Sequence, residues 1–161
     1  MPVTVNLRHL EKGNVTLEGE LPVEELDIDS RDELIRAMRP LEYKVEVQQL
    51  EQALLVRGRL RLVLDCDCAR CLKHFPFAVE LDPYTLHVPL EGEEKAVVTN
   101  DCVDLTPFFR EDILLEFPRH PLCDPECGGV QRPARGKSSS AGAPQDKKNP
   151  ALWAELNKLK F

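Results

Sequence analysis

The sequence predicts an α+β fold, in which a β-rich antiparallel sheet or partly open barrel carries two short helices. Three observations lead to this prediction. Apolar and polar residues alternate over much of the first hundred residues, the two-residue period of half-buried strands. A proline-flanked helical pattern follows near residue 106. Two pairs of closely spaced cysteines lie before the preceding strand and after that helix. They indicate a four-cysteine zinc-knuckle staple, that is, one zinc ion that cross-links two distant parts of the chain.

The strands are predicted from the alternation itself. Residues 3–7 and 15–21 alternate on either side of a turn-forming Lys-Gly-Asn sequence, which predicts a hairpin between them. Residues 43–64 alternate over a longer stretch and predict a second antiparallel hairpin that turns near Gln52. Residues 75–87 follow as one more strand. Together these segments form the predicted sheet.

Two helices are predicted from capping residues and prolines. Ser30 and Glu33 have the spacing of a capping box, and Pro40 stops the helix that they begin. Thr106 is the predicted N-cap of the second helix, which Pro118 ends. One face of this second helix is apolar, with Phe109, Ile113 and Phe117.

Composition divides the chain into three parts. Residues 1–130 form the predicted β-rich domain, and residues 131–148 are a flexible linker rich in Arg, Pro, Gly, Ser, Ala and Lys. Residues 149–161 begin with Asn-Pro and predict a short amphipathic helical tail. A helix this short is marginal alone, so it needs a groove in a partner or a surface of its own domain. Its apolar stripe is the predicted partner-binding site: Leu152, Trp153, Leu156 and Leu159.

Charge and composition limit the function classes. The net charge of −7 argues against a generic nucleic-acid binder, but it conceals a split. Residues 1–130 hold 14 Lys and Arg against 26 Asp and Glu, a net of −12, whereas residues 131–161 hold 7 against 2. No apolar run reaches the length of a membrane span and no secretory signal is evident, so we expect a cytoplasmic protein with no membrane partner.

The cysteines are the strongest chemical signal in the sequence. Cys68 and Cys71 form a C-x-x-C pair, and Cys123 and Cys127 form a C-x-x-x-C pair followed by two glycines. Each spacing lets the chain curl so that both sulfurs face one ion, and four thiolates complete a tetrahedral zinc site. Such a site has no open position for a substrate, so the predicted zinc is structural.

Two other interpretations of the cysteines stay open. Free cysteines are often small buried hydrophobes, and this suits Cys66 and Cys102 well. Redox chemistry is less favoured, because a thioredoxin-like C-x-x-C opens a helix, and the residues after Cys71 continue like a strand. His74 and His120 lie near the pairs in sequence and are possible substitute ligands.

Arginines at every second position suggest a site for phosphate groups. Arg57, Arg59 and Arg61 project from one face of the predicted strand, and a row of guanidinium groups can contact successive phosphates. Lys147 and Lys148 in the linker are further candidates for RNA contact. The alternative is cross-strand pairing with acids of the neighbouring strand, namely Glu42, Glu46 and Glu51.

Three segments of the sequence together resemble those of one family. They are Cys68-Ala-Arg-Cys71-Leu72, the segment from Val103 to Pro118 with its Arg-Glu-x-x-Leu-Leu sequence, and Pro121-Leu-Cys123 leading to Cys127-Gly-Gly. With Val56-Arg-Gly before them, they are similar to the bacterial YceD family of large ribosomal RNA subunit accumulation proteins. The likeness covers most of residues 40–130 and the closing segment from Asn149.

This resemblance implies a non-enzymatic cytoplasmic factor of ribosome biogenesis. Its expected partners are large-subunit ribosomal RNA or its precursor and a ribosomal protein, with no small-molecule substrate. Catalytic sequence motifs are absent, which agrees with this expectation. Two alternatives stay open. One is an adaptor for a basic ribosomal protein without RNA contact. The other is a metal nuclease built from Asp65, Asp67, Asp101 and Asp104.

Overall fold

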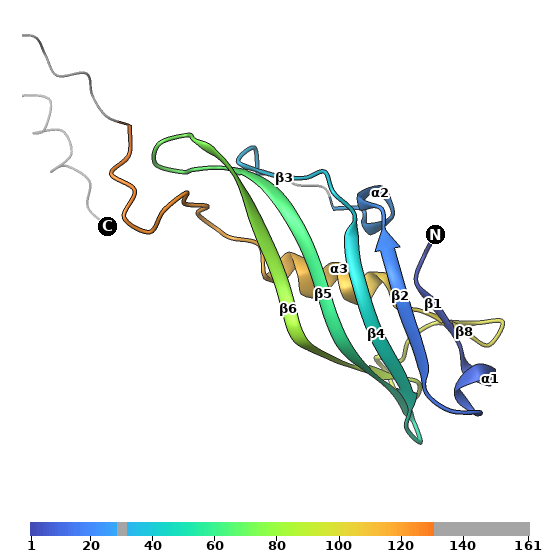
Figure 1. Ribbon diagram of the computed structural model, residues 1–161. Helices are drawn as coiled ribbons and strands as arrows, with labels where there is room; N and C mark the ends of the chain where they lie inside the picture. The colour runs from blue at the N-terminus through green and yellow to red at the C-terminus, as the bar shows by residue number, and fades with distance from the viewer. Residues whose placement is uncertain (29–31, 131–161) are drawn as a thin grey trace, which may run out of the picture. The chain divides into compact units, whose positions relative to one another are not determined.

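The computed structural model describes residues 1–28 and 32–130. Eleven elements follow one another in this part of the chain (Figure 1). They are β1 (Thr4–Asn6), α1 (Leu7–Leu10), β2 (Val15–Leu21), α2 (Val23–Leu26), β3 (Ile35–Ala37), β4 (Leu41–Gln49), β5 (Ala53–Asp67), β6 (His74–Pro89), β7 (Val98–Thr99), β8 (Cys102–Asp104) and α3 (Thr106–Leu115). The linker predicted at 131–148 and the helix predicted at 149–161 lie outside the described residues.

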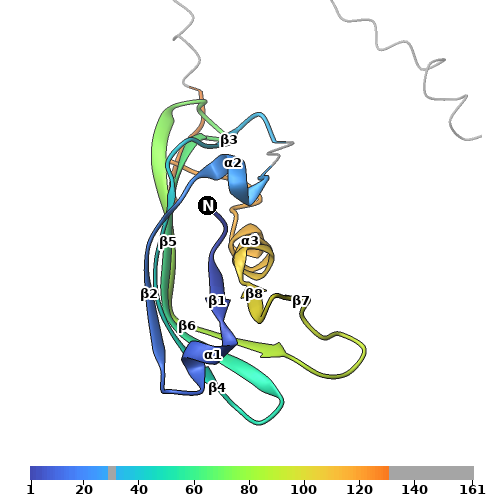
Figure 2. The same cartoon turned by 90° about the vertical axis from the view of Figure 1, so that its right-hand side faces the viewer.

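A five-stranded antiparallel sheet is the main body, with β5 at its centre. On one side β5 pairs with β4 and then with β3, and β2 pairs with the far edge of β4. On its other side β5 pairs with β6 over nearly its whole length. The predicted hairpin that turns near Gln52 is therefore confirmed as β4 and β5, and the strand predicted at 75–87 is β6. The sheet curves into a half-barrel, which confirms the predicted α+β class (Figure 2).

The core lies on the concave face of this half-barrel. Alternate residues of β5 face inward and are fully buried, as the period of two requires. Helix α3 and a small sheet of order β1-β8-β7 cover that face (Figure 2). Phe109 of α3 is completely buried, and its ring packs against those of Tyr43 and Tyr84, with centroids 6.1 and 5.7 Å away. These ring contacts hold α3 against the concave face of the sheet.

The predicted helix near residue 106 is confirmed, but Thr106 is not its N-cap. Leu105 holds the cap position, and the Asp104 carboxylate accepts a hydrogen bond from the Thr106 N–H at 2.9 Å. The Thr106 hydroxyl instead accepts from the backbone N–H of Val3, also at 2.9 Å, in a buried contact. Thr106 thus ties the first strand of the chain to the start of α3. The sequence alone could not reveal this, because the two residues are 103 positions apart.

Two local predictions are wrong, both because tertiary pairing outweighs local pattern. Residues 3–7 and 15–21 form no hairpin, since α1 intervenes and β1 pairs with β8 instead. The capping-box pattern predicted a helix up to Pro40, but residues 35–37 form β3 along β5. Ile35 is only 3% exposed there, so the sheet buries a β-branched side chain that an exposed helix would leave in water.

Replacing Tyr84 by phenylalanine is expected to lower the free energy of unfolding by about 2 kcal/mol. The Tyr84 hydroxyl donates to an Asp112 carboxylate oxygen at 2.6 Å, and its side chain is almost fully buried. The matched control is Tyr43→Phe, because the Tyr43 ring also packs on Phe109, yet its hydroxyl has no hydrogen-bond partner within residues 1–28 and 32–130. Urea unfolding measures both variants, and equal losses would contradict the prediction.

The Tyr84 contribution also depends on pH. Burial, and then the Asp112 carboxylate, raise the pKa of Tyr84 above its ordinary value near 10. The folded state therefore holds this proton more tightly than the unfolded state does. We expect the stability difference between the wild type and Tyr84→Phe to be constant below about pH 10 and to shrink as the pH rises further.

No helix in the described part of the chain is long and apolar enough to cross a membrane.

Candidate functional site

The four predicted metal ligands converge at one end of the half-barrel. Cys68 and Cys71 lie in the turn between β5 and β6, and Cys123 and Cys127 lie in the segment that follows α3. Their four sulfurs all lie within 4.8 Å of one another. The Cys68 and Cys127 sulfurs are 3.7 Å apart, and those of Cys71 and Cys123 are 3.6 Å apart.

These distances fit a tetrahedral zinc ion. Zn–S bonds of about 2.3 Å at tetrahedral angles place neighbouring sulfurs about 3.8 Å apart. Four soft thiolate donors are the set that zinc prefers in closed structural sites. The Cys68 side chain is buried and the other three are half-buried, so the cluster is shielded from bulk solvent on one side. The arrangement is thus compatible with a metal site and leaves no coordination position for a substrate.

Backbone hydrogen bonds hold the two cysteine pairs together. The Cys68 N–H donates to the Lys73 carbonyl, and the Leu72 N–H returns to the Cys68 carbonyl, both at 2.9 Å. The two pairs are joined where the Ala69 N–H donates to the Pro121 carbonyl at 2.8 Å and the Arg70 guanidinium donates to the Cys127 carbonyl at 2.9 Å. The sulfurs are therefore positioned by the chain itself.

The turns that form the knuckles use left-handed backbone. Leu72 follows the first pair with φ of 61°, and Gly129 follows the second pair with φ of 82°. Glycine is the ordinary residue for this conformation, and leucine adopts it at a cost. The Leu72 side chain is 66% exposed, so burial does not offset that cost.

Backbone N–H dipoles around the cluster favour loss of the Cys68 proton before that of the Cys123 proton. Backbone N–H groups of Cys123 and Cys71 face the Cys68 sulfur and lower the pKa of this thiol to about 6. The hydrogen bond with the neighbouring Cys71 side chain raises the pKa of Cys123 to about 12, because a proton shared between adjacent sulfurs opposes a second negative charge. A divalent cation removes this opposition, since coordination deprotonates thiols outright.

The remaining cysteines lie apart from the cluster. Cys66 is completely buried in the core, and burial raises the pKa of its thiol. Cys102 belongs to β8, where the Asn6 amide donates to its sulfur at 3.6 Å. The C-x-x-C pair opens no helix, because β6 begins three residues after Cys71. This argues against a thioredoxin-like redox site.

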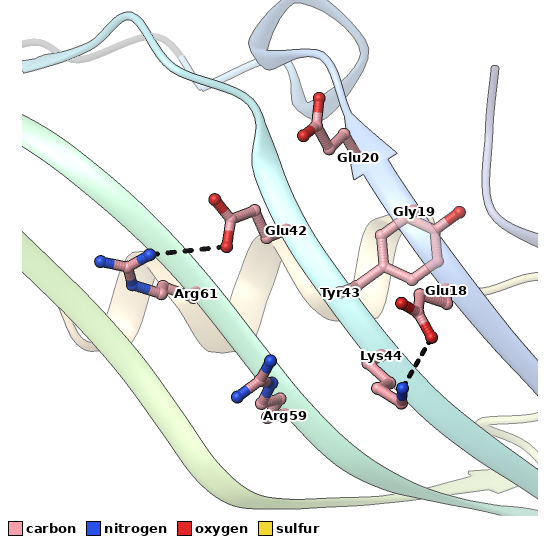
Figure 3. Close-up of a pocket in the computed structure, with 8 residues that line it drawn as sticks. All are labelled: Glu18, Gly19, Glu20, Glu42, Tyr43, Lys44, Arg59 and Arg61. Carbon is pink, nitrogen blue, oxygen red and sulfur yellow. Dashed lines mark ion pairs between the residues drawn. The ribbon is translucent and has the colours of Figure 1, made fainter.

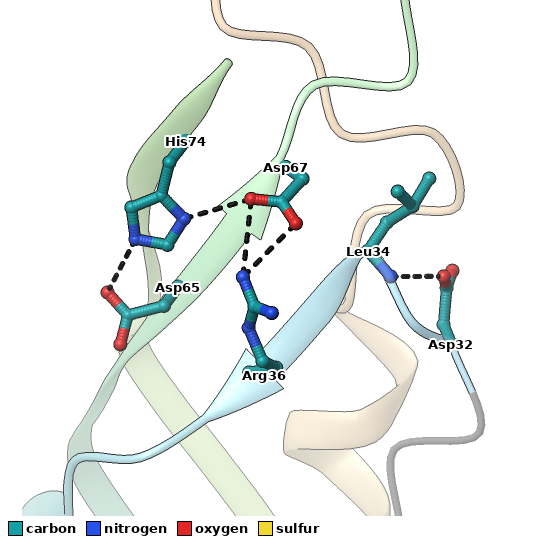
Figure 4. Close-up of polar contacts among 6 residues, drawn as sticks. All are labelled: Asp32, Leu34, Arg36, Asp65, Asp67 and His74. Atoms are coloured by element: carbon teal, nitrogen blue, oxygen red, sulfur yellow. Dashed lines mark hydrogen bonds and ion pairs between the residues drawn. The ribbon is translucent and has the colours of Figure 1, made fainter. Parts of the chain in front are cut away.

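A polar cluster beside the first cysteine pair was not predicted from the sequence (Figure 4). One Arg36 nitrogen contacts the two Asp67 carboxylate oxygens at 3.3 and 3.1 Å, and His74 Nδ1 lies 2.9 Å from Asp67 Oδ1. The other ring nitrogen of His74 is 3.8 Å from Asp65. The His74 hydrogen bond lowers the pKa of Asp67. Both ring nitrogens of His74 thus face aspartates of β5, and neither belongs to the sulfur cluster.

The carboxylates of the nuclease hypothesis do not meet. Asp65 and Asp67 lie on β5 within the polar cluster. Asp101 instead pairs with Arg8 at 2.6 Å, and the Asp104 carboxylate accepts from the Thr106 N–H at 2.9 Å. Within residues 1–28 and 32–130 the cysteine cluster is the one group of three or more His, Cys, Asp or Glu close enough to share an ion. The hypothesis that these four aspartates form a nuclease metal centre is therefore wrong.

The three predicted arginines do share one exposed face of β5, but they differ in their partners. Arg61 makes ion pairs with Glu42 at 3.6 Å and with Glu80 at 2.9 Å. Arg57 and Arg59 lie opposite Glu46 and Lys44 in the register, and neither makes an ion pair with the described residues. Figure 3 shows Arg59 beside Arg61 with no ion pair drawn to it.

The alternative of cross-strand pairing is thus realised at one position of the arginine row. It applies to Arg61 and Glu42, which are direct register partners. Glu51 lies in the turn between β4 and β5 and faces no arginine across the sheet. Other candidates fall outside the described residues, namely Lys147, Lys148, Leu152, Trp153, Leu156 and Leu159.

Comparison with known proteins gives a family and a relative. The family model described as "Large ribosomal RNA subunit accumulation protein YceD" matches residues 56–160, a range that holds the arginine row and both cysteine pairs. "Uncharacterized protein YlbN" of Bacillus subtilis (strain 168) is 27% identical over 161 residues, covering 87% of this chain and 91% of the relative. No solved structure matches this chain significantly. Since the family model spans more than half of the sequence, the chain belongs to the YceD family of large ribosomal RNA subunit accumulation proteins.

Proposed function

We propose that this protein is a non-enzymatic cytoplasmic factor that supports the accumulation or processing of large-subunit ribosomal RNA by binding that RNA. Family membership supports the ribosomal role. RNA contact rests on one observation. Arg57 and Arg59 project from the outer face of β5, both exposed, without an ion-pair partner among residues 1–28 and 32–130. Guanidinium groups that make no ion pair are available to phosphates.

The spacing of these two arginines suits a nucleic-acid strand. Two residues along a strand span about 6.6 Å, so the two groups reach neighbouring phosphates of one backbone. Arg61 is a weaker member of the proposed surface, because a phosphate has to compete with Glu42 and Glu80 for it. Lys147 and Lys148 add positive charge from the basic C-terminal part of the chain, and Leu152, Trp153, Leu156 and Leu159 are its proposed contact with a protein partner.

A structural Zn²⁺ belongs to the same proposal. Cys68, Cys71, Cys123 and Cys127 would hold it, and the ion would supply a cross-link between the end of β5 and the segment after α3. The sulfur distances and the all-thiolate donor set support zinc over harder cations. With four protein ligands the ion stabilises the fold and takes no part in a reaction.

RNA binding is tested by the salt dependence of affinity for fragments of large-subunit ribosomal RNA. We expect the double variant Arg57→Gln, Arg59→Gln to bind more weakly and to reduce the slope of log affinity against log salt by about 1.5, because two phosphate contacts are lost. The control is Lys12→Gln, Lys95→Gln, which removes the same charge from exposed loops elsewhere. Fluorescence anisotropy measures both. Equal slopes for the two double variants would refute the arginine contact.

A second candidate function is an adaptor for a basic ribosomal protein. It is favoured by the net charge of −12 over residues 1–130, because an acidic surface steers cationic partners towards it. Capture of the tagged full chain from its own cells, with and without ribonuclease, separates the two functions. A ribosomal protein that stays bound after ribonuclease treatment, together with no affinity for purified RNA, would replace the first proposal by the second.

A further inference from the structure

Strand β6 leaves most of its outer backbone edge without a partner strand among the described residues. It is the longest strand of the sheet, with 16 residues, and within the described part of the chain it pairs with β5 alone. Figure 1 shows β6 at the border of the sheet, with no other strand alongside its outer edge. The opposite border of the sheet is β2, which has only seven residues. An unpaired edge of this length is a template for another strand.

The register shows which backbone groups point to this edge. Pro76 lies opposite Asp65 and has no N–H, so this pair is a non-hydrogen-bonded one. Residues two and four positions further along, Ala78 and Glu80, therefore turn their N–H and C=O groups outward. Beyond the irregularity opposite Gly58, the Pro89 carbonyl also points outward, where it accepts from the Ala96 N–H at 2.8 Å.

The stretch around Ala78 lacks one protection that edge strands commonly have, a lysine or an arginine. Lysines and arginines at an edge discourage pairing, and β6 contains neither. Its charged side chains other than histidine are Glu80 and Asp82, both exposed and acidic, and Glu80 shares one of its carboxylate oxygens with Arg61 at 2.9 Å. Pro76 and the bulge near Asp82 confine the usable edge to the stretch between them.

The concave side of the same stretch is apolar. Phe77 and Leu81 point inward and are only half-buried, while Val79 between them is buried. An incoming strand would place alternate side chains on the two faces of the sheet. One set would meet Phe77 and Leu81, and the other would meet Ala78 and Glu80 on the outer face.

We propose that the β6 edge at residues 77–81 binds an extended segment of a partner protein in which cationic and aliphatic side chains alternate. The segment adds a strand to the sheet by backbone hydrogen bonds to Ala78 and Glu80. Its Lys or Arg side chains lie beside Glu80, and its aliphatic ones pack on Phe77 and Leu81. The net charge of −12 over residues 1–130 attracts such a segment.

Charge and sequence favour this occupant over two others. A second copy would bring two acidic bodies together and align acidic strands with each other. Residues 131–148 of this chain are basic, but seven of these 18 residues are Gly, Pro or Ser and none is Val, Ile or Leu. Residues 149–161 contain one short run in which cationic and apolar residues alternate, Lys158-Leu-Lys160-Phe161, and the hydrogen-exchange test below separates this run from a partner segment. The inference goes beyond the proposed function, because it requires no RNA.

The test uses a fluorescent ten-residue peptide of alternating Lys and Val with the full-length protein, without RNA. We expect saturable binding by fluorescence anisotropy, and chemical-shift changes centred on the Ala78 and Glu80 amides in NMR spectra. A peptide of the same sequence that is N-methylated at every second residue keeps the charge but cannot pair along one edge. We expect it to bind at least about tenfold more weakly.

Protein variants test the same site from the other side. Ala78→Pro removes an outward N–H and leaves the bonds to β5 in place, as Pro76 already does, and we expect it to weaken peptide binding at least about tenfold. Glu80→Gln should weaken binding by about threefold, and Glu20→Gln on β2 serves as its charge-matched control with unchanged affinity.

Several results would overturn the proposal. If the N-methylated and the unmodified peptide bind the wild-type protein with equal affinity, charge attraction alone holds the peptide. This comparison uses no protein variant, so it does not depend on whether the variants fold. Equal losses in Glu80→Gln and Glu20→Gln would place the peptide elsewhere. Slow hydrogen exchange of the Ala78 and Glu80 amides before peptide is added would show that the edge is already occupied. If that protection then depended on protein concentration, the occupant would be a second copy. If it did not, the occupant would be the chain's own C-terminal part.

Discussion

Replacing Cys71 by serine is expected to abolish stoichiometric zinc and to lower the melting temperature by on the order of 10 °C. The variant keeps three thiolates and replaces the Cys71 sulfur, which lies 3.6 Å from the Cys123 sulfur, with a hydroxyl, although a zinc ion needs a fourth soft donor there. Loss of the ion also removes the cross-link between the end of β5 and the segment after α3. Elemental analysis of protein purified under reducing conditions, with calorimetry, measures both effects.

Cys102→Ser is the matched control for this variant. Cys102 is also a half-buried free cysteine, but it lies on β8 and is not part of the sulfur cluster. A serine there can still accept the hydrogen bond from the Asn6 amide. We expect one zinc per chain and a nearly unchanged melting temperature. Wild-type protein that carries no zinc, combined with equal melting of the two serine variants, would refute the structural zinc.

Gly58→Ala is expected to lower the free energy of unfolding by about 3 kcal/mol or more. Gly58 lies on β5 between two exposed arginines, where the pairing with β6 loses its regular register. Its φ is +157°, and a Cβ at this position would overlap the Lys44 carbonyl oxygen and approach the Val45 Cα to 2.7 Å. Both contacts are backbone atoms of β4, which cannot turn away as a side chain can. The two strands have to separate locally to admit a methyl group.

Gly13→Ala separates this overlap from the cost of the backbone conformation alone. Gly13 has a comparable φ of +143°, but a Cβ there meets nothing within 4 Å. We expect a loss of about 1 kcal/mol for this control, measured with Gly58→Ala by urea unfolding. If the two losses are the same, close approach of β4 is not the reason for glycine at position 58.

Some elements were predictable because their signals are local. The apolar alternation of residues 43–64 and 75–87 depends only on neighbours in sequence, and it predicted β4, β5 and β6. The proline and capping residues around 106 and 118 predicted α3 for the same reason. The cysteine spacings were equally local, since each pair lies within a few residues. What the spacings could not show is that the two pairs meet, and the sulfur distances supply this.

Other elements depended on contacts distant in sequence. The capping-box pattern at 30–33 indicated a helix, but Ile35 gains more by burial beside Cys66 in the sheet than an isolated short helix provides. The pairing of β1 with β8 joins residues about a hundred positions apart, for which no local signal exists. The polar cluster of Arg36, Asp67 and His74 likewise forms only after β3 and β6 take their places beside β5.

The sequence by itself determined the antiparallel strands, the helix after residue 105, the two cysteine pairs and the arginine row, because each follows from residue spacing within one element. The tertiary structure decided which of these features meet. It brought four sulfurs together, and it placed Arg61, but not Arg57 or Arg59, in ion pairs. It also left the edge of β6 without a partner among the described strands. The physical reason is that register and burial are properties of pairs of elements, and each is set by the summed packing of strands that lie far apart in the chain.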